Sequence, residues 1–335
     1  MGNVYPWNAI EADFSHGLIL GNGASIAFDP RFAYHSLKDS ATDQGLITPD
    51  VQRVFDHLQT ADFELVLRML WHASKINRAL EIPDDRTTRA YEAVREALIQ
   101  VVHVIHVPHD QVRARLAPAA AFMSRFSTVL SLNYDVLVYW AMLVGNEDAP
   151  NRYKDCLLNT KFQQDWEPFR EPYGTNSKAT LVFYPHGCIA LAADLAGAEF
   201  KIHADADGAL LDTVFQRWRA GNTTPVFVSE GTTEQKRAAI HRSPYLSTVY
   251  VQVLPHLGES VVVFGWSLQD NDNHLLDALC CCGVPRRFAV AANPGAANLD
   301  EFEARIRGKL AARLGPNEFE LIFFDRSSPG CWIAT

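Results

Sequence analysis

The sequence lacks the signals that would indicate a bound metal or a place in or across a membrane. Its six cysteines include no Cys-x-x-Cys pair, so neither a zinc knuckle nor a disulfide framework is predicted. No apolar run reaches the roughly 18–20 residues that a membrane helix needs. The amino terminus has no basic start followed by a long apolar stretch, so no secretion signal is readable. We therefore expect a cytoplasmic protein with no metal and no membrane partner.

Basic residues are also outnumbered, with 30 Lys and Arg against 39 Asp and Glu and a formal net charge of -9. Because the phosphate backbone repels a chain of this sign, direct binding to nucleic acid is not expected. Apolar residues, in contrast, make up 48% of the chain, which is enough to bury a full core. The chain is predicted to be globular.

Short apolar runs recur along the chain and are predicted strands. They lie at residues 17–20, 127–132, 181–184, 225–228, 261–264, 288–291 and 321–324. Runs that are apolar on every residue are typical of a parallel sheet covered on both faces. Helical spacing of three and four residues occurs between them, at 51–71, 87–106, 134–144, 245–257 and 299–314. This alternation predicts an α/β fold with a doubly wound, Rossmann-like parallel sheet.

Two long segments interrupt that alternation. About a hundred residues with helical patterns separate the first two predicted strands, which is too long for a simple crossover. We therefore predict a helical insertion over residues 38–125, with residues 1–37 and 126–335 forming the α/β core. Residues 146–177 are rich in Pro, Asn, Gln and Asp and are expected to form an irregular excursion packed on the core.

A glycine-rich segment follows the first predicted strand directly, with the sequence Gly21-Asn22-Gly23-Ala24-Ser25. Two glycines one residue apart allow a sharp turn and let the backbone approach a pyrophosphate, to which peptide N–H groups and a hydroxyl could donate. The third glycine of the usual dinucleotide fingerprint is missing, and a tight strand exit without any ligand has the same pattern. On its own, the segment leaves both interpretations open.

Polar residues stand at the ends of other predicted strands. Asn133 and Asp135 follow strand 127–132, and His186 follows strand 181–184. Ligands collect at the carboxyl edge of a parallel sheet, so these side chains are expected near the glycine segment. Taken singly, Asn133 or Asp135 is more simply a helix cap, and His186 a hydrogen-bonded structural residue. Three such groups at neighbouring strand ends favour a shared site.

The same arrangement recurs toward the carboxyl terminus. Gly265-Trp266-Ser267 follows strand 261–264, and Asn293 follows strand 288–291. Together with the glycine segment, Asn133-x-Asp135 and His186-Gly187, this order of motifs resembles the sirtuin superfamily. The closer resemblance is to sirtuin-like proteins of bacteria, several of which hydrolyse NAD in anti-phage defence, and it includes a little-characterised bacterial branch. It covers the α/β core, about two thirds of the chain.

The resemblance implies a role for each motif. The loop residues Gly21, Asn22, Gly23, Ala24 and Ser25 would hold the dinucleotide, with Gly265, Ser267 and Asn293 on its adenosine half. Asn133 would position the attacking water or the ribose hydroxyls, Asp135 would bind the nicotinamide carboxamide, and His186 would act as general base. Cleavage of the nicotinamide–ribose bond passes through an oxocarbenium-like state, for which a positioned water and a base of near-neutral pKa are suited.

Two departures from the deacylating sirtuins bear on the activity. This chain has no zinc-binding cysteine pairs, and Leu132 precedes Asn133 where deacylating sirtuins have Gln. We therefore predict NAD+ hydrolysis to nicotinamide and ADP-ribose, with NAD as substrate and no zinc. The alternatives are a catalytically silent NAD- or nucleotide-sensing module and a protein deacylase or ADP-ribosyltransferase. The resemblance also implies a homo-oligomer or a complex with a sensor protein.

Two further groups of residues are not expected to form sites. His103, His106 and His109 have a three-residue spacing but too few partners for a metal. Lys236, Arg237 and Arg242 could meet a phosphate or face solvent, and solvent is favoured.

Overall fold

The computed structural model describes residues 3–33, 36–194, 196–204, 209–221, 223–228 and 232–334. Within these residues the largest sheet has eight strands in the order β1-β13-β12-β11-β2-β3-β7-β4, and all neighbours in it run parallel. The strands are β1 (Val4–Tyr5), β2 (Gly17–Leu20), β3 (Thr128–Ser131), β4 (Tyr153–Lys154), β7 (Thr180–Phe183), β11 (Ser260–Phe264), β12 (Arg287–Ala292) and β13 (Glu320–Asp325).

The central strands form where the sequence predicts them. Every residue of β2, β3, β7 and β11 is buried, because helices cover both faces of the sheet. In the middle of the sheet, Leu18 of β2 pairs with Val262 of β11 and Val129 of β3. The predicted α/β class with a parallel sheet is confirmed. The short strands β1 and β4 extend the sheet at its two edges and were not predicted from the sequence.

One strand prediction is wrong in its partners. The run at 225–228 lies in β10 (Thr223–Phe227), which pairs antiparallel with β8 (Gly187–Asp194), and β8 in turn pairs antiparallel with β9 (Glu199–Lys201). These strands form a separate three-stranded sheet. A buried strand reads as apolar in either kind of sheet, so the run itself could not identify its partners. The aromatic ring of Phe227 stacks on Tyr134 at 5.4 Å between centroids and so connects this sheet to the end of β3.

Between β2 and β3 the chain is helical, as the sequence predicts. The prediction of a single helix over 51–71 is nevertheless wrong, because one helix ends at residue 57 and the next begins at residue 63. Gln59 has a positive φ of 49°, and the Asp62 carboxylate then caps a new helix by accepting from the N–H groups of Glu64 and Leu65. The helices in this region are α1 (Asn22–Phe28), α2 (Leu37–Asp43), α3 (Pro49–His57), α4 (Phe63–Ala79), α5 (Arg86–Ile105) and α6 (His109–Met123).

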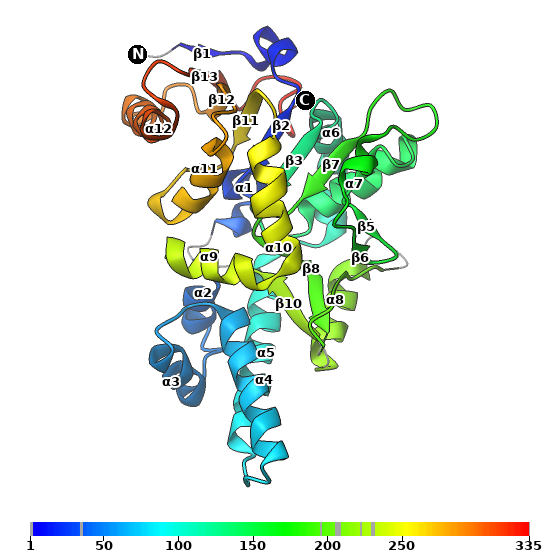
Figure 1. The fold of residues 1–335 in the computed structure, drawn as a ribbon, viewed down its shortest axis with the longest axis vertical. Coiled ribbons are helices and arrows are strands. Elements are labelled where there is room, and N and C mark those ends of the chain that lie inside the picture. Colours follow the sequence, from blue (N-terminus) through cyan, green and yellow to red (C-terminus); the bar gives the residue numbers. More distant parts are fainter. Residues whose placement is uncertain are drawn as a thin grey trace.

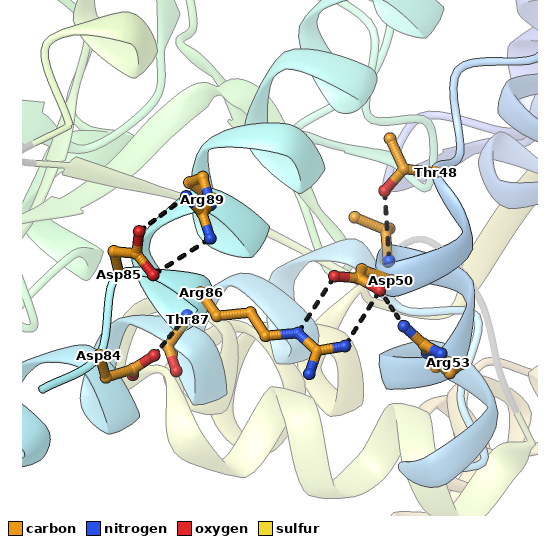
Figure 2. A network of polar contacts seen from close by, with 9 residues as sticks. Thr48, Asp50, Arg53, Asp84, Asp85, Arg86, Thr87 and Arg89 are labelled. Atoms are coloured by element: carbon orange, nitrogen blue, oxygen red, sulfur yellow. Dashed lines mark hydrogen bonds and ion pairs between the residues drawn. The ribbon is translucent and has the colours of Figure 1, made fainter.

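The α4–α5 hairpin projects away from the main sheet at the lower end of Figure 1. A polar network joins the start of α5 to α3, as Figure 2 shows. The Arg86 guanidinium donates to both carboxylate oxygens of Asp50, at 3.2 and 3.3 Å, and Arg53 pairs with the same carboxylate. Arg89 pairs with Asp85 one turn earlier. These groups are exposed, so the ion pairs contribute little to stability.

The remaining helices cover the sheets, with α11 and α12 on one side of the main sheet and α6 and α7 on the other (Figure 1). Residues 244–256 form a helical stretch that includes one π turn, Val249–Val253. In the segment 146–177, a short hairpin of β5 (Leu157–Leu158) and β6 (Lys161–Phe162) follows β4. The other helices are α7 (Leu137–Asp148), α8 (Leu210–Arg219), α9 (Thr233–Arg242), α10 (Pro244–Thr248), α11 (Asn273–Cys280) and α12 (Leu299–Leu314).

Contacts of the buried Trp332 side chain position the first helix, α1. The indole N–H of Trp332, near the carboxyl terminus, donates to the backbone oxygen of Ala24 at 3.0 Å, and its ring meets Phe28 edge to face. Trp332 is 2% exposed. A buried indole normally has such a polar partner, so this bond ties α1 to the end of the chain. Among the described residues, no helix has the length and apolarity that a membrane span requires.

Candidate functional site

The glycine segment lies against the loop that follows β11. The Gly21 N–H donates to Phe264 O at 2.9 Å, and the Gly23 N–H donates to Gly265 O at 2.8 Å. A Cβ on Gly21 would lie 2.5 Å from Trp266 Cα, and one on Gly23 would lie 2.7 Å from Gly265 Cα. Both glycines are therefore required because two backbone loops touch.

This packing corrects part of the sequence interpretation. The N–H groups of Gly21 and Gly23 donate to carbonyl oxygens of the neighbouring loop, and the Ala24 N–H donates to Gly21 O at 2.9 Å. Those three groups were expected to face an anion, and here each has a backbone partner. The Asn22 amide donates to Phe32 O at 3.2 Å, on the outer side of the loop.

Three predicted residues form one buried hydrogen-bond network at the ends of β2 and β3. The Asn133 amide nitrogen donates to Gly21 O at 3.0 Å and to Ser25 Oγ at 2.7 Å. The Ser25 hydroxyl donates to Asp135 Oδ2 at 2.5 Å. Because both amide hydrogens of Asn133 are used, its Oδ1 is the atom that can accept from a water or a sugar hydroxyl. The expectation that the residues at these strand ends lie close together is met for these three residues.

Asp135 also has a structural role. Its second oxygen, Oδ1, accepts from the Leu137 N–H at 2.9 Å, at the start of α7. Burial raises the pKa of Asp135, while the Ser25 hydroxyl and the Leu137 N–H oppose that rise. The carboxylate therefore accepts a hydrogen bond at the first turn of α7, as the capping interpretation expects, and it also orients the Ser25 hydroxyl.

His186 lies at the end of β7 and is 5% exposed. Its Nε2 is 3.1 Å from Nε2 of His274, and the two rings lie 25° from parallel with centroids 5.3 Å apart, so the two nitrogens face each other. Burial lowers the pKa of His186 to about 3, against opposing effects of the Asp272 carboxylate and the Leu132 backbone. Leu132 directly precedes Asn133, so the ring is next to the network around that amide. With a pKa of about 3, His186 is neutral at physiological pH and can accept a proton, but it is a weaker base than the histidine of near-neutral pKa expected from the sequence.

An ion pair that the sequence did not predict lies beside the histidines. Lys236 was expected in solvent, but its side chain is 7% exposed and its Nζ donates to Asp272 Oδ1 at 2.8 Å. Asp272 Oδ2 accepts from the Trp266 indole at 3.0 Å. Because α9 packs against this loop, the charge of Lys236 is enclosed and paired. The expectation of exposure holds for Arg237 and Arg242.

A cavity of about 230 Å³ adjoins the glycine segment at the carboxyl ends of β11 and β12. Its lining includes the predicted residues Gly23, Gly265 and Asn293. Ser267 does not line it; that residue is exposed, and its backbone oxygen accepts from Arg305 at 3.0 Å. The other lining residues are Phe264, Ala291, Ala292, Ala296, Asn298, Leu299, Phe302 and Arg326.

The three spaced histidines do not gather as ligands. His106 is buried, with its Nε2 3.2 Å from the Val136 N–H, and its ring meets Phe32 and Trp140 edge to face. His103 packs instead on Phe215. Within the part of the chain that the structure describes, no group of three or more His, Cys, Asp or Glu is arranged to hold a metal ion.

Nearly the whole chain, including the residues described above, matches one protein family. A family model described as a domain of unknown function, DUF4917, matches residues 18–332. The chain belongs to the DUF4917 family. No curated protein matches the sequence. The matched residues of this DUF4917 protein run from β2 through the last strand and include the glycine segment, the Asn133 network and both paired histidines.

Sequence reasoning missed His274, Asp272 and Lys236. His274 is the second residue of α11, a helix that starts soon after the strand-end loop at Gly265. That closeness to a strand end was the one signal that could have identified it. Lys236 follows the run at 225–228 and was expected in solvent, because only the packing of α9 encloses it.

Proposed function

We propose that this DUF4917 protein hydrolyses NAD+ to nicotinamide and ADP-ribose. The observation that supports the proposal most is the hydrogen-bonded set of Asn133, Ser25 and Asp135 at the carboxyl edge of the sheet. Within this set, Ser25 lies two residues after Gly23, which lines the cavity. Ligands of doubly wound sheets bind at this edge. The dinucleotide would extend from the network, across the glycine segment, to the cavity beside Asn293.

The reaction requires little from the protein beyond the positioning of the substrate and the attacking water. The bond between the ribose C1′ and the nicotinamide nitrogen breaks, and nicotinamide leaves as a neutral molecule, so no strong acid is needed. Water adds to the resulting oxocarbenium-like carbon and loses a proton. Asn133 Oδ1 would accept a hydrogen bond from that water, and neutral His186 would accept a proton. In well-oriented reactions, positioning of this kind lowers the activation barrier by about 7 kcal/mol or more.

The resemblance to bacterial sirtuin-like proteins supports the same reaction and, with it, a role in anti-phage defence. Leu132 in place of Gln, and the lack of zinc-binding cysteine pairs, favour hydrolysis over deacylation. Transfer of ADP-ribose to a protein acceptor would begin with the same bond cleavage. It would be recognised by nicotinamide release without a matching amount of free ADP-ribose.

A silent NAD-binding module is the second candidate, and one observation favours it. His186 Nε2 faces His274 instead of open space, so the base is engaged in this structure. Such a module would bind NAD+ without releasing nicotinamide. Turnover measurements separate the two candidates directly.

The test is incubation of the purified protein with NAD+, with nicotinamide and ADP-ribose separated by chromatography and NAD+ affinity measured by calorimetry. We expect equal amounts of both products from wild type, and none from Asn133→Ala or His186→Ala. Asn317→Ala removes an exposed amide at the opposite edge of the sheet and should behave as wild type. Thermal melts establish that each variant is folded. Saturable binding without products would favour the silent module, and absence of binding would refute both candidates.

A further inference from the structure

His274 is fully buried, with 0% of its surface exposed, although the proposed reaction assigns it no role. Its Nε2 is 3.1 Å from Nε2 of His186, which is hydrogen-bonding distance between two ring nitrogens. The rings lie 25° from parallel. A direct contact between two imidazoles requires that one Nε2 carries a proton and the other a lone pair. The pair therefore fixes the tautomers of both rings relative to each other.

Neighbouring elements hold His274 in this position. The Tyr250 hydroxyl donates to the backbone oxygen of His274 at 3.1 Å, and the Tyr250 ring stacks on the imidazole at 6.2 Å. On the preceding loop, Asp272 is fixed by Lys236 and by the Trp266 indole. Because each of these contacts is buried or partly buried, the imidazole has little freedom to turn away from His186.

The other nitrogen of His274, Nδ1, is buried and has no hydrogen-bond partner within the described structure. A buried polar atom without a partner costs about 1–3 kcal/mol. An apolar residue of similar size would avoid this cost, so core packing alone does not account for a histidine here. The polar contact of this ring within the described residues is that of its Nε2 with His186.

We propose that His274 is a positioning residue, whose Nε2 holds the His186 ring in place through a direct nitrogen–nitrogen hydrogen bond. The catalytic consequence rests on the proposed NAD+ hydrolysis, whereas the ring contact itself does not. Within that reaction, His274 sets the direction in which the lone pair or the N–H of His186 points. Substrate binding would then displace or share this bond when His186 accepts a proton.

The charges around the pair are consistent with two neutral rings. Burial lowers the pKa of His274 to about 4 and that of His186 to about 3. Asp272 opposes both shifts, and Asp277 opposes the shift of His274. Lys236 strengthens both shifts, Arg237 strengthens that of His274, and the His274 ring strengthens that of His186. Neither ring is therefore expected to carry a charge between pH 5 and 8.

Two substitutions separate positioning from packing. Glutamine places its amide nitrogen near the location of the histidine Nε2, so His274→Gln should keep the bond to His186. Leucine fills the space without a donor, so His274→Leu should lose it. We expect His274→Leu to lower kcat by roughly 10- to 100-fold with little change in KM, since misplacement of a catalytic group has effects of this size. His274→Gln should restore most of the activity.

The matched control is His256→Leu, which removes an exposed histidine near the amino end of β11. It should leave kcat and KM unchanged. In the pH profile of kcat, the acidic limb of His274→Leu should lie at higher pH than that of wild type, because a loosened His186 ring is easier to protonate. If His274→Leu keeps the wild-type kcat and pH profile while His186→Ala is inactive, the positioning role is refuted.

A second measurement does not depend on NAD+. In protein labelled with ¹⁵N in its histidine rings, long-range proton–nitrogen spectra report the tautomer and charge of each ring. We expect the signals that His186→Gln and His274→Gln remove to stay neutral from pH 8 to pH 5 in wild type. If wild type does not turn over NAD+ but these rings stay neutral and coupled, the proposed function fails and the pair stands. If His186 titrates as an ordinary histidine, unaffected by His274→Leu, the inference fails.

Discussion

The contact between the glycine segment and the loop after β11 leads to a sharp prediction about Gly265. This residue has a φ of 72°, and a Cβ added to it would lie 2.7 Å from Gly23 Cα and closer still to the Ala24 nitrogen. Gly283 has nearly the same φ, 70°, but a Cβ there would meet nothing within 4 Å. Alanine at Gly283 therefore introduces only left-handed strain, whereas alanine at Gly265 adds a collision between two backbones.

The expected magnitudes follow from these two terms. Left-handed strain costs about 1–2 kcal/mol for a residue with a Cβ. Overpacking against atoms that cannot rotate away adds about 1–3 kcal/mol. We therefore expect Gly283→Ala to lower the free energy of unfolding by about 1 kcal/mol and Gly265→Ala by about 3 kcal/mol. The backbone shift should also move Ser25 away from Asn133 and reduce any NAD+ turnover in Gly265→Ala alone.

Urea unfolding followed by tryptophan fluorescence measures both variants on the same scale. Because the two substitutions share the backbone term, their difference isolates the loop contact. Equal destabilisation of the two variants would show that the loops do not touch as described, and the reasoning about the glycine segment would then be wrong.

Three further predictions concern buried polar groups. Ser25→Ala, which removes the hydroxyl that donates to Asp135, should lower the free energy of unfolding by about 1–3 kcal/mol in urea titrations and abolish turnover in the chromatographic assay. Lys236→Met should lower the free energy of unfolding by about 3–5 kcal/mol, because Asp272 then keeps an unpaired buried charge. The double variant with Asp272→Asn should recover part of this loss, and additive effects of the two substitutions would refute the pairing. Burial raises the pKa of Glu64 from 4.5 to about 8, so the folded state keeps a proton that the unfolded state loses. Stability should therefore fall as pH rises from 4.5 to 8, by at most about 1.4 kcal/mol per unit, and Glu64→Gln should flatten that dependence in urea titrations.

Much of the candidate site could be predicted because parallel strands have a direction. The apolar runs that form the main parallel sheet all end at the same edge, so the residues that follow β2 and β3 had to come together. Ser25, Asn133 and Asp135 do so within hydrogen-bonding distance. For the same reason Gly23, Gly265 and Asn293 line one cavity. These expectations needed only the order of strands and their polar ends.

Apolar periodicity is a local property of the chain, so the sequence was enough to predict the central strands of the main sheet, most of the helices and the edge at which polar residues gather. Which groups meet across that edge depends on the tertiary packing. The antiparallel partners of β10, the burial of Lys236 and the contact of His186 with His274 all depend on how α9, α11 and the small sheet pack. Such contacts join residues far apart in the sequence, and no local pattern records them.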